Sequence, residues 1–339
     1  MVGRRRALLA KASTSPGHRR FPLAPRISAP YPPFVSFRKE RMPGLRHRSM
    51  VEVNEFLVLD FIRERGDTTR PEIARELAMS AASVSRLVHR LRESGLIQES
   101  EGSAGGAGRP RSRISFNPGA GAVVAVDLGG TRCHGALADL GGSILAEDVR
   151  PTREGSSAYA TLRRCIDRLR AESAERGLPV AAIAIGVPAI VDAQTGRALG
   201  GPNVDWQGFD LLGRLAKDVD VPFTVENDVD LAALAQAWRG EARHLRDFVT
   251  LSIGTGIGAA AVVDGRLVKG HHNAAGEVGY MVLTREQLAE PGAGGLGGFE
   301  RVATGPAIAR RAATLLRASP DGSVLAPDSV SPQAVFEAA

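Results

Sequence analysis

Residues 126–131 read Val-Asp-Leu-Gly-Gly-Thr, and residues 251–258 read Leu-Ser-Ile-Gly-Thr-Gly-Ile-Gly. Each stretch is a glycine-rich turn that follows a run of β-branched residues. Glycines let backbone N–H groups come close to phosphate oxygens, so turns of this kind are common anion sites. One such turn is a weak signal. Its repetition after about 120 residues predicts an α/β domain in which two turns face one phosphate-bearing ligand.

The residues beside these turns extend the prediction. We expect a buried strand over 123–127, a return strand over 134–140 and a further strand over 144–149. The Asp127 carboxylate could hold Mg²⁺ through water, and the Thr131 hydroxyl adds a hydrogen-bond donor. The predicted phosphate-binding or nucleotide-binding residues are Asp127, Gly129, Gly130, Thr131, Gly254, Thr255 and Gly256.

A third polar stretch lies between the two turns. Residues 222–226 are expected to form a strand that ends at Asn227-Asp228, before an Ala/Leu-rich helix over 231–238. A carboxylate at the end of a strand is well placed to accept a proton from a sugar hydroxyl. The alternative is that Asp228 only caps the helix. Asn203 and Trp206 belong either to a loop turn or to one wall of a sugar pocket.

Residues 50–117 predict a module of another kind. An amphipathic helix over 54–65 is followed by Thr69-Arg-Pro-Glu72, the pattern of a capping box at the start of a short helix. Ser80 is expected to cap the next helix. Because only residues 78–80 separate the two helices, the pattern predicts a helix-turn-helix.

The helix after Ser80 has two faces. Its apolar residues recur at spacings of three and four, so one face is expected to be buried: Val84, Leu87, Val88 and Leu91. The polar face is expected to enter the major groove of double-stranded DNA. Strands over 96–99 and 114–116, joined by a glycine-rich turn, would complete a winged helix-turn-helix. The predicted DNA-binding residues are Ser83, Ser85, Arg86, Arg90 and Arg109.

The charge pattern leaves an alternative for this module. Residues 51–120 hold ten Lys/Arg and ten Asp/Glu, so a small helical bundle with a solvated charged face also fits. The net charge of +6 comes from residues 1–50, where 12 Lys/Arg and one acid make +11 and leave −5 for the rest of the chain. Seven prolines and no apolar period predict disorder there. This tail is a basic arm for DNA, a transit peptide or translated upstream sequence.

Composition bounds the class of protein. The longest apolar run, 180–191, is shorter than the roughly 20 residues of a membrane-spanning helix and is expected to be a buried strand leading into a loop. Two cysteines, Cys133 and Cys165, cannot form a disulfide framework. We therefore expect a cytoplasmic protein with a disordered tail over 1–49, a DNA-binding domain over 50–117 and an α/β domain over 118–339.

The order of these motifs resembles the ROK family, named for repressors, open reading frames and kinases, and within it the transcriptional regulators. The resemblance covers residues 50–339 and rests on Asp127-Leu-Gly-Gly-Thr131, Ile185-Gly-Val-Pro188, Glu226-Asn-Asp228, Gly254-Thr-Gly-Ile-Gly258, Gly276-Glu-Val-Gly279 and Glu300-Arg-Val-Ala-Thr-Gly305. It implies an actin-like, ribonuclease H-like sugar-kinase fold after an all-α, winged-helix domain. It also implies that Asp228 matches the catalytic base of the kinases. The residues that it implies for sugar binding are Asn203, Asn227, Asp228, Glu277 and Glu300.

The chain departs from the family pattern in two places. The resemblance places a zinc-binding His and three zinc-binding cysteines at positions that are here Tyr280, Pro291, Ala293 and Gly298. None of these offers a thiolate or imidazole, so we expect no zinc and a mobile glycine-rich loop over 291–300. The chain also ends at Ala339, where the family continues with helices that close over adenine, so we expect an incomplete nucleotide site.

Three functions follow as hypotheses. The leading one is a DNA-binding repressor of carbohydrate-utilisation genes, with a double-stranded DNA operator and a sugar or sugar phosphate effector as partners, and a homo-oligomer when full-length. This hypothesis requires no cofactor. The alternative is an ATP-dependent, glucokinase-like sugar kinase that uses ATP and Mg²⁺, alone or within a bifunctional protein. The third is a non-functional fragment of a regulator.

Overall fold

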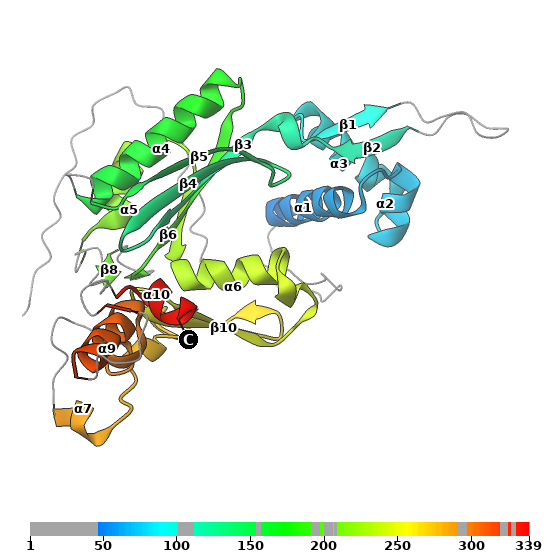
Figure 1. The fold of residues 1–339 in the computed structure, drawn as a ribbon. Coiled ribbons are helices and arrows are strands. Elements are labelled where there is room, and N and C mark those ends of the chain that lie inside the picture. Colours follow the sequence, from blue (N-terminus) through cyan, green and yellow to red (C-terminus); the bar gives the residue numbers. More distant parts are fainter. Residues whose placement is uncertain are drawn as a thin grey trace, which may run out of the picture. The chain divides into compact units, whose positions relative to one another are not determined.

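The computed structural model of the chain describes residues 47–100, 112–153, 157–191, 197–199, 206, 209–289, 297–318, 325–326 and 330–338. Figure 1 shows the order of its helices and strands. Residues 1–46 of the predicted tail lie outside the described residues. The rest of the chain contains a helical module with a small sheet, followed by an α/β module with two larger sheets.

The first module has three helices and a two-stranded antiparallel sheet. Its elements are α1 (His47–Arg65), α2 (Arg70–Glu76), α3 (Ala81–Glu93), β1 (Ile97–Ser100) and β2 (Arg113–Phe116). In the sheet, Ile97 pairs with Phe116. The predicted start of the first helix at residue 54 is wrong: residues 47–53 contain neither Gly nor Pro, and the helix extends back through them.

The two later helices begin where capping residues predict. Glu72 Oε2 accepts hydrogen bonds from the Thr69 N–H at 2.9 Å and the Thr69 hydroxyl at 3.0 Å, which is a capping box. Ser80 Oγ accepts from the Ser83 N–H at 3.2 Å. The buried core of the module comprises Val58, Ile62, Ile73, Val84, Leu87, Val88, Leu91, Ile97 and Ile114. The buried face predicted for α3 is therefore confirmed.

The second module is built on a five-stranded sheet with the order β5-β4-β3-β6-β9. Its strands are β3 (Ala122–Leu128), β4 (Arg132–Asp139), β5 (Ile144–Pro151), β6 (Val180–Val187) and β9 (Phe223–Asn227). Strand β4 is antiparallel to β3 and β5, whereas β3, β6 and β9 are parallel. Parallel strands have their carboxyl ends at one edge of a sheet. The register consequently aligns Asp127 with Gly186, and Gly186 with Glu226, near that edge.

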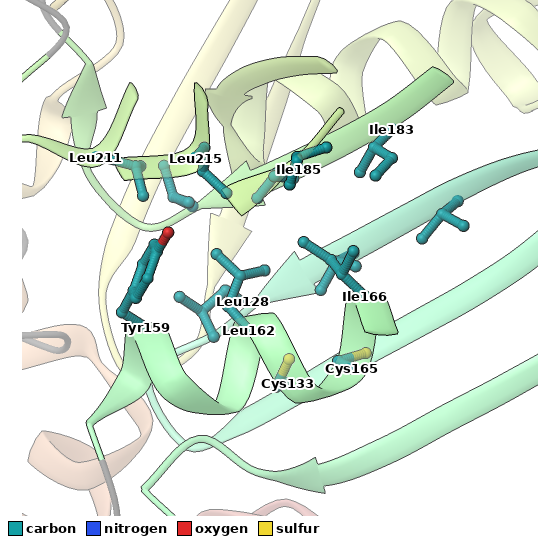
Figure 2. Close-up of a cluster of buried hydrophobic side chains, with 14 of the residues drawn as sticks. Leu128, Cys133, Tyr159, Leu162, Cys165, Ile166, Ile183, Ile185, Leu211 and Leu215 are labelled. Carbon is teal, nitrogen blue, oxygen red and sulfur yellow. The ribbon is translucent and has the colours of Figure 1, made fainter. Parts of the chain in front are cut away.

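The core of this module lies between the sheet and helix α4 (Ala158–Glu175). Figure 2 shows Leu162 of α4 beside Leu128 of β3, and Ile166 of α4 belongs to the same cluster. Apolar residues of α4 recur at spacings of three and four, so a single face of the helix is buried. Helix α5 (Leu211–Asp218) adds Leu211 and Leu215 to the same cluster.

A second sheet follows further along the chain, with the order β10-β11-β12. Its strands are β10 (Phe248–Ile253), β11 (Ile257–Val263) and β12 (Arg266–Leu267), and helix α6 (Asp228–Trp238) packs against β10 and β11. The remaining elements are helix α9 (Gly305–Ala318) and several short ones: β7 (Ile190–Val191), β8 (Ala198–Leu199), α7 (Arg285–Ala289), α8 (Glu300–Ala303), α10 (Pro332–Glu337), and 3-10 turns over Pro118–Ala120, Glu241–His244 and Val278–Tyr280. Among the described helices, none has the length and apolar character needed to cross a membrane.

Candidate functional site

The two glycine-rich turns face one cavity of about 800 Å³. One turn joins β3 to β4, the other joins β10 to β11, and the start of α6 and the segment 274–280 complete the wall. Small-molecule sites typically have volumes of about 300–1,000 Å³, so the cavity has room for a small ligand. The predicted ligand-binding residues that line it are Asp127, Gly129, Gly130, Thr131, Asn227, Asp228, Gly254, Thr255, Gly256, Glu277 and Glu300.

Two further residues were predicted as candidates for the wall of a sugar pocket, and neither is among the lining residues above. Asn203 lies outside the described residues, so its role stays a prediction. Trp206 is buried and stacks on Phe209, with ring centroids 5.4 Å apart. It belongs to the hydrophobic core of the module rather than to the lining of the cavity.

The first glycine turn is held in place by a residue that sequence reasoning missed. The hydroxyl of Thr152 donates to the Gly129 carbonyl at 2.6 Å, and the Thr152 N–H donates to the Thr131 carbonyl at 3.0 Å. Thr152 is fully buried. It follows β5, and an isolated threonine at the end of a strand carries no signal for this role.

Two carboxylates meet at the strand edge. Gly186 lies between Asp127 and Asp228, since a Cβ on it would be 3.7 Å from both the Asp127 Oδ1 and the Asp228 Cα. Burial, with the nearby Asp127 carboxylate next, raises the pKa of the Asp228 carboxyl to about 6. Burial also raises the pKa of Asp127. A carboxyl group with a pKa near 6 can exchange a proton at neutral pH.

Helix α6 is capped by Asn227, not by Asp228. The Asn227 Oδ1 accepts from the N–H groups of Val229 at 2.9 Å and Asp230 at 3.2 Å. Asp228 is the first residue of the helix, and its Oδ1 accepts from the Val229 N–H at 2.9 Å. The interpretation of Asp228 as the cap is therefore wrong, and the part of Asn227 left for a ligand is its amide NH₂ group.

Two glutamates on the other wall have different surroundings. Glu300 accepts from the Ile257 N–H at 2.9 Å through Oε1 and from the Gly297 N–H at 3.2 Å through Oε2. Both of its oxygens are thus engaged by the backbone. Burial raises the pKa of Glu277, and Glu300 and Asp228 raise it further. Among the described residues the Glu277 carboxyl has no hydrogen-bond partner, so Glu277 is the freer acceptor.

An ion pair beside α6 was also missed. Glu226 of β9 is buried and pairs with Lys269, which follows β12. Burial, with the Glu226 carboxylate next, raises the pKa of Asp230 to about 6. The lysine could not be predicted, because it is isolated in the sequence and 43 residues from its partner.

The polar residues of α3 lie on its exposed side, as predicted. Arg86 and Ser85 are exposed, and the Arg86 guanidinium donates to the Ser83 hydroxyl at 3.5 Å. Arg90 pairs with Glu55 of α1 at 2.7 Å. Arg109 lies outside the described residues.

Other cations of this module are also paired. Arg70 pairs with Glu99 at 2.6 Å, and Arg113 of β2 pairs with Asp67 at 3.3 Å. Among the described residues Arg86 has no acidic partner, and it lies near the N-terminal end of α3.

The predicted glycine-rich loop over 291–300 needs a correction. Residues 297–300 pack against residues 279–281, and the Phe299 N–H donates to the Gly279 carbonyl at 3.2 Å. Pro291 and Ala293 lie outside the described residues. Tyr280 and Gly298 offer no zinc ligand, and no cluster of three His, Cys, Asp or Glu side chains suited to a metal occurs within the described part of the chain.

The structure thus combines a winged helix with a two-sheet α/β domain that contains a glycine-lined cavity. Comparisons with protein families agree with this combination of domains. Residues 51–106 match the MarR family. Residues 123–339 match the ROK family. The chain belongs to the ROK family, and its second module has the sugar-kinase-like α/β fold that the motifs predict.

Relatives include both regulators and kinases. The chain is 28% identical over 242 residues to the xylose repressor of Caldicellulosiruptor bescii, which covers 70% of this chain and 60% of that protein. The crystal structure of a ROK family transcriptional regulator, a homologue of the E. coli MLC protein, matches 85% of this chain and 74% of its own, with a TM-score of 0.72 and 26% identity. A ROK family glucokinase from Streptomyces griseus, in complex with glucose and AMPPNP, matches 64% of this chain and 70% of its own, with a TM-score of 0.55 and 27% identity. The chain thus spans about 60% of the length of this xylose repressor.

Proposed function

We propose that the chain is a transcriptional repressor of carbohydrate-utilisation genes, in which a sugar or sugar phosphate in the cavity changes the affinity of the winged helix for double-stranded DNA. The observation that carries the proposal is that one chain contains both an exposed reader helix with Arg86 and a cavity with free carboxyl acceptors. A kinase does not need the reader helix. The similarity to a xylose repressor and to a ROK transcriptional regulator supports the same choice.

The chemistry of the cavity favours a polyhydroxylated ligand. Asp228 and Glu277 offer acceptors for hydroxyl groups, and the Asn227 amide offers a donor. The N–H groups of the two glycine turns suit an anion such as a phosphate, apart from those of Gly129 and Gly254, which donate to the Arg132 and Gly256 carbonyls. We assign the hydroxyl groups of the ligand to the first set and any phosphate to the second.

Sensing requires that the ligand prefer one conformation of the protein. A ligand shifts an equilibrium only through different affinities for two states. The lining comes from turns of two separate sheets, so contacts to both turns depend on how far apart those turns are. Coupling of about 1–3 kcal/mol, which changes affinity about 5–150-fold, would suffice for regulation. We further propose that the regulator acts in the cytoplasm and that full-length copies form a homo-oligomer.

Thermal unfolding in the presence of ligands tests the binding part of the proposal. The panel comprises D-xylose, D-glucose, an amino sugar and their phosphates, each with and without Mg·ATP. A ligand that binds the native state raises the melting temperature in a concentration-dependent way. We expect at least one sugar or sugar phosphate to do so without ATP. No shift with any of them up to millimolar concentration would contradict a sugar sensor.

A second candidate is an ATP-dependent sugar kinase, favoured by the pKa of about 6 for Asp228 beside Asp127. In that case Asp228 would take the proton of the sugar hydroxyl, and Asp127 would hold Mg²⁺ through water. The ion would neutralise charge on the transferred phosphoryl group. A coupled ADP assay across the sugar panel decides the matter. Turnover of about 1–100 per second that is lost in Asp228→Asn would establish a kinase.

A further inference from the structure

The cavity wall that carries Tyr280 and Glu300 is closed by an unusually tight approach of two backbone segments. A Cβ on Gly297 would lie 2.0 Å from the Gly279 carbonyl oxygen and 2.4 Å from the Tyr280 Cα. A Cβ on Gly279 would lie 2.5 Å from the Ile257 carbonyl oxygen. Only glycine fits at such distances. We call the contact of residues 279–281 with residues 297–298 the glycine seam.

One side chain outside the cavity fastens this seam. Gln287 of α7 accepts through Oε1 from the N–H groups of Leu283 at 2.7 Å and Thr284 at 3.3 Å. Its Nε2 donates to the Gly298 carbonyl at 3.0 Å. The bond from the Thr284 N–H is one half of a capping-box pattern at the start of α7, because Gln287 follows Thr284 by three residues. The third bond joins α7 to the seam.

The seam continues into the cavity. The Gly297 N–H donates to Glu300, and the other oxygen of Glu300 accepts from Ile257 of the second glycine turn. Tyr280, Glu300 and Ile257 all line the cavity. Displacement of residues 297–298 would therefore move a cavity wall.

The family resemblance implies a zinc ion in this part of the fold, but the residues here do not fit one. The described segments of the seam present glycine, tyrosine and methionine, and no thiolate or imidazole. The hydrogen bonds of Gln287 and the glycine packing supply a cross-link that needs no metal.

We propose that Gln287 is a positioning residue: through Gly298 it holds the Tyr280–Glu300 wall in its ligand-binding arrangement, independently of any metal ion. The ligand-binding part of this proposal rests on the proposed function. The structural part does not, because the seam is formed by contacts between residues of the chain.

The variant Gln287→Glu separates the two roles of the Gln287 side chain, which accepts from Leu283 and Thr284 and donates to Gly298. A glutamate at this position keeps the acceptor for Leu283 and Thr284, as in other capping boxes, but cannot donate to Gly298. Leu288→Ala is the matched control, since Leu288 is the next residue of α7 and is 71% exposed. Hydrogen exchange is followed at the amides of Gly297, Phe299 and Ile257, with Leu283 and Thr284 as internal references.

We expect Gln287→Glu to speed exchange at Gly297 and Phe299 about two- to tenfold, the range for the loss of one hydrogen bond, and to leave the reference amides unchanged. For Gln287→Glu, the Kd of the sugar or sugar phosphate that stabilises the unmutated chain should rise by a similar factor. The melting temperature of Gln287→Glu should equal that of Leu288→Ala. A purely structural role would lower the melting temperature without changing Kd. Treatment of the unmutated chain with EDTA or 1,10-phenanthroline should change neither exchange nor Kd.

Exchange in Gln287→Glu that matches Leu288→Ala would overturn the proposal. So would a loss of protection or binding after chelation that zinc restores, which would reveal a metal site in the same region. If exchange responds as expected but no sugar of the panel binds the unmutated chain, the seam stands and the proposed function fails.

Discussion

The Glu300 carboxylate accepts a hydrogen bond from the Ile257 N–H at 2.9 Å, so a glutamate of the cavity wall holds the second glycine turn in place. Its other oxygen accepts from Gly297. Glu277, on the same wall, has no hydrogen bond from its carboxyl to another described residue, and burial raises its pKa. Two glutamates that the family resemblance treats alike therefore have different functions in this chain: Glu300 stabilises the cavity and Glu277 is available to a ligand.

Substitution of the two glutamates should separate these functions. Glu300→Gln replaces an acceptor by an NH₂ group facing a backbone N–H, so the free energy of unfolding should fall by about 1–3 kcal/mol. Glu277→Gln removes a half-buried charge without breaking a hydrogen bond to a described residue, so stability at pH 7.5 should be unchanged or higher while sugar affinity falls. Urea unfolding of both variants and ligand titration measure this. Equal destabilisation by both would refute the distinction.

Asp228→Asn should stabilise the protein and weaken ligand binding. The pKa of Asp228 is raised to about 6 in the folded state, compared with about 4 for an exposed aspartate. Its ionisation is therefore disfavoured by folding. At pH 7.5 the variant should be more stable by up to about 3 kcal/mol.

The stabilisation expected for Asp228→Asn should depend on pH. A raised folded-state pKa means that the contribution of Asp228 to stability is fully present below pH 4 and is lost as the pH rises through about 6. The gain from Asp228→Asn should thus vanish near pH 4 and level off above pH 7. Thermal unfolding from pH 4 to 8 measures it. A variant that is less stable than the unmutated chain at pH 7.5 would contradict the burial of this charge.

Glu55→Gln should raise affinity for DNA of any sequence. Glu55 pairs with Arg90 on the exposed side of α3, so the guanidinium has to leave this partner to reach a phosphate. Removing the acid frees one cation, and the slope of log K against log salt should steepen by up to about 0.9. Glu52→Gln, an exposed acid of the same helix, is the control. The same slope and affinity in both variants would mean that Arg90 does not contact DNA.

Arg86→Ala should reduce specificity rather than general affinity. Arg86 is exposed, lacks an acidic partner among the described residues and lies near the start of α3. A bidentate contact from arginine to a base is worth about 1–3 kcal/mol. Electrophoretic mobility shifts on the DNA upstream of the gene and on a scrambled duplex give the ratio of specific to nonspecific affinity. An unchanged ratio would show that Arg86 does not contribute to base recognition.

Local patterns predicted much of the fold and of the cavity lining. The buried face of α3 follows from spacing, and the strands before both glycine turns follow from β-branched runs. Part of the lining was predictable because the first glycine turn and Asn227-Asp228 follow the carboxyl ends of β3 and β9, which lie at one edge of the parallel strands.

Contacts between distant residues were not predictable. The bonds from Glu300 to Ile257, from Gln287 to Gly298 and from Arg90 to Glu55 join residues 43, 11 and 35 positions apart. Their existence depends on tertiary packing, which a single sequence does not encode as a local pattern. For the same reason a mobile loop was predicted over residues 291–300; of these the structure describes 297–300, where glycines allow close packing.

The central claim is that ligand binding in the cavity controls DNA binding by the winged helix. Fluorescence anisotropy of a labelled duplex from the upstream region, titrated with the protein with and without the sugar that raises its melting temperature, tests it most directly. We predict that this sugar weakens DNA binding about 5–150-fold, and that Asp228→Asn needs more sugar for the same effect. DNA affinity that stays the same at a saturating concentration of a sugar that demonstrably binds would contradict the account.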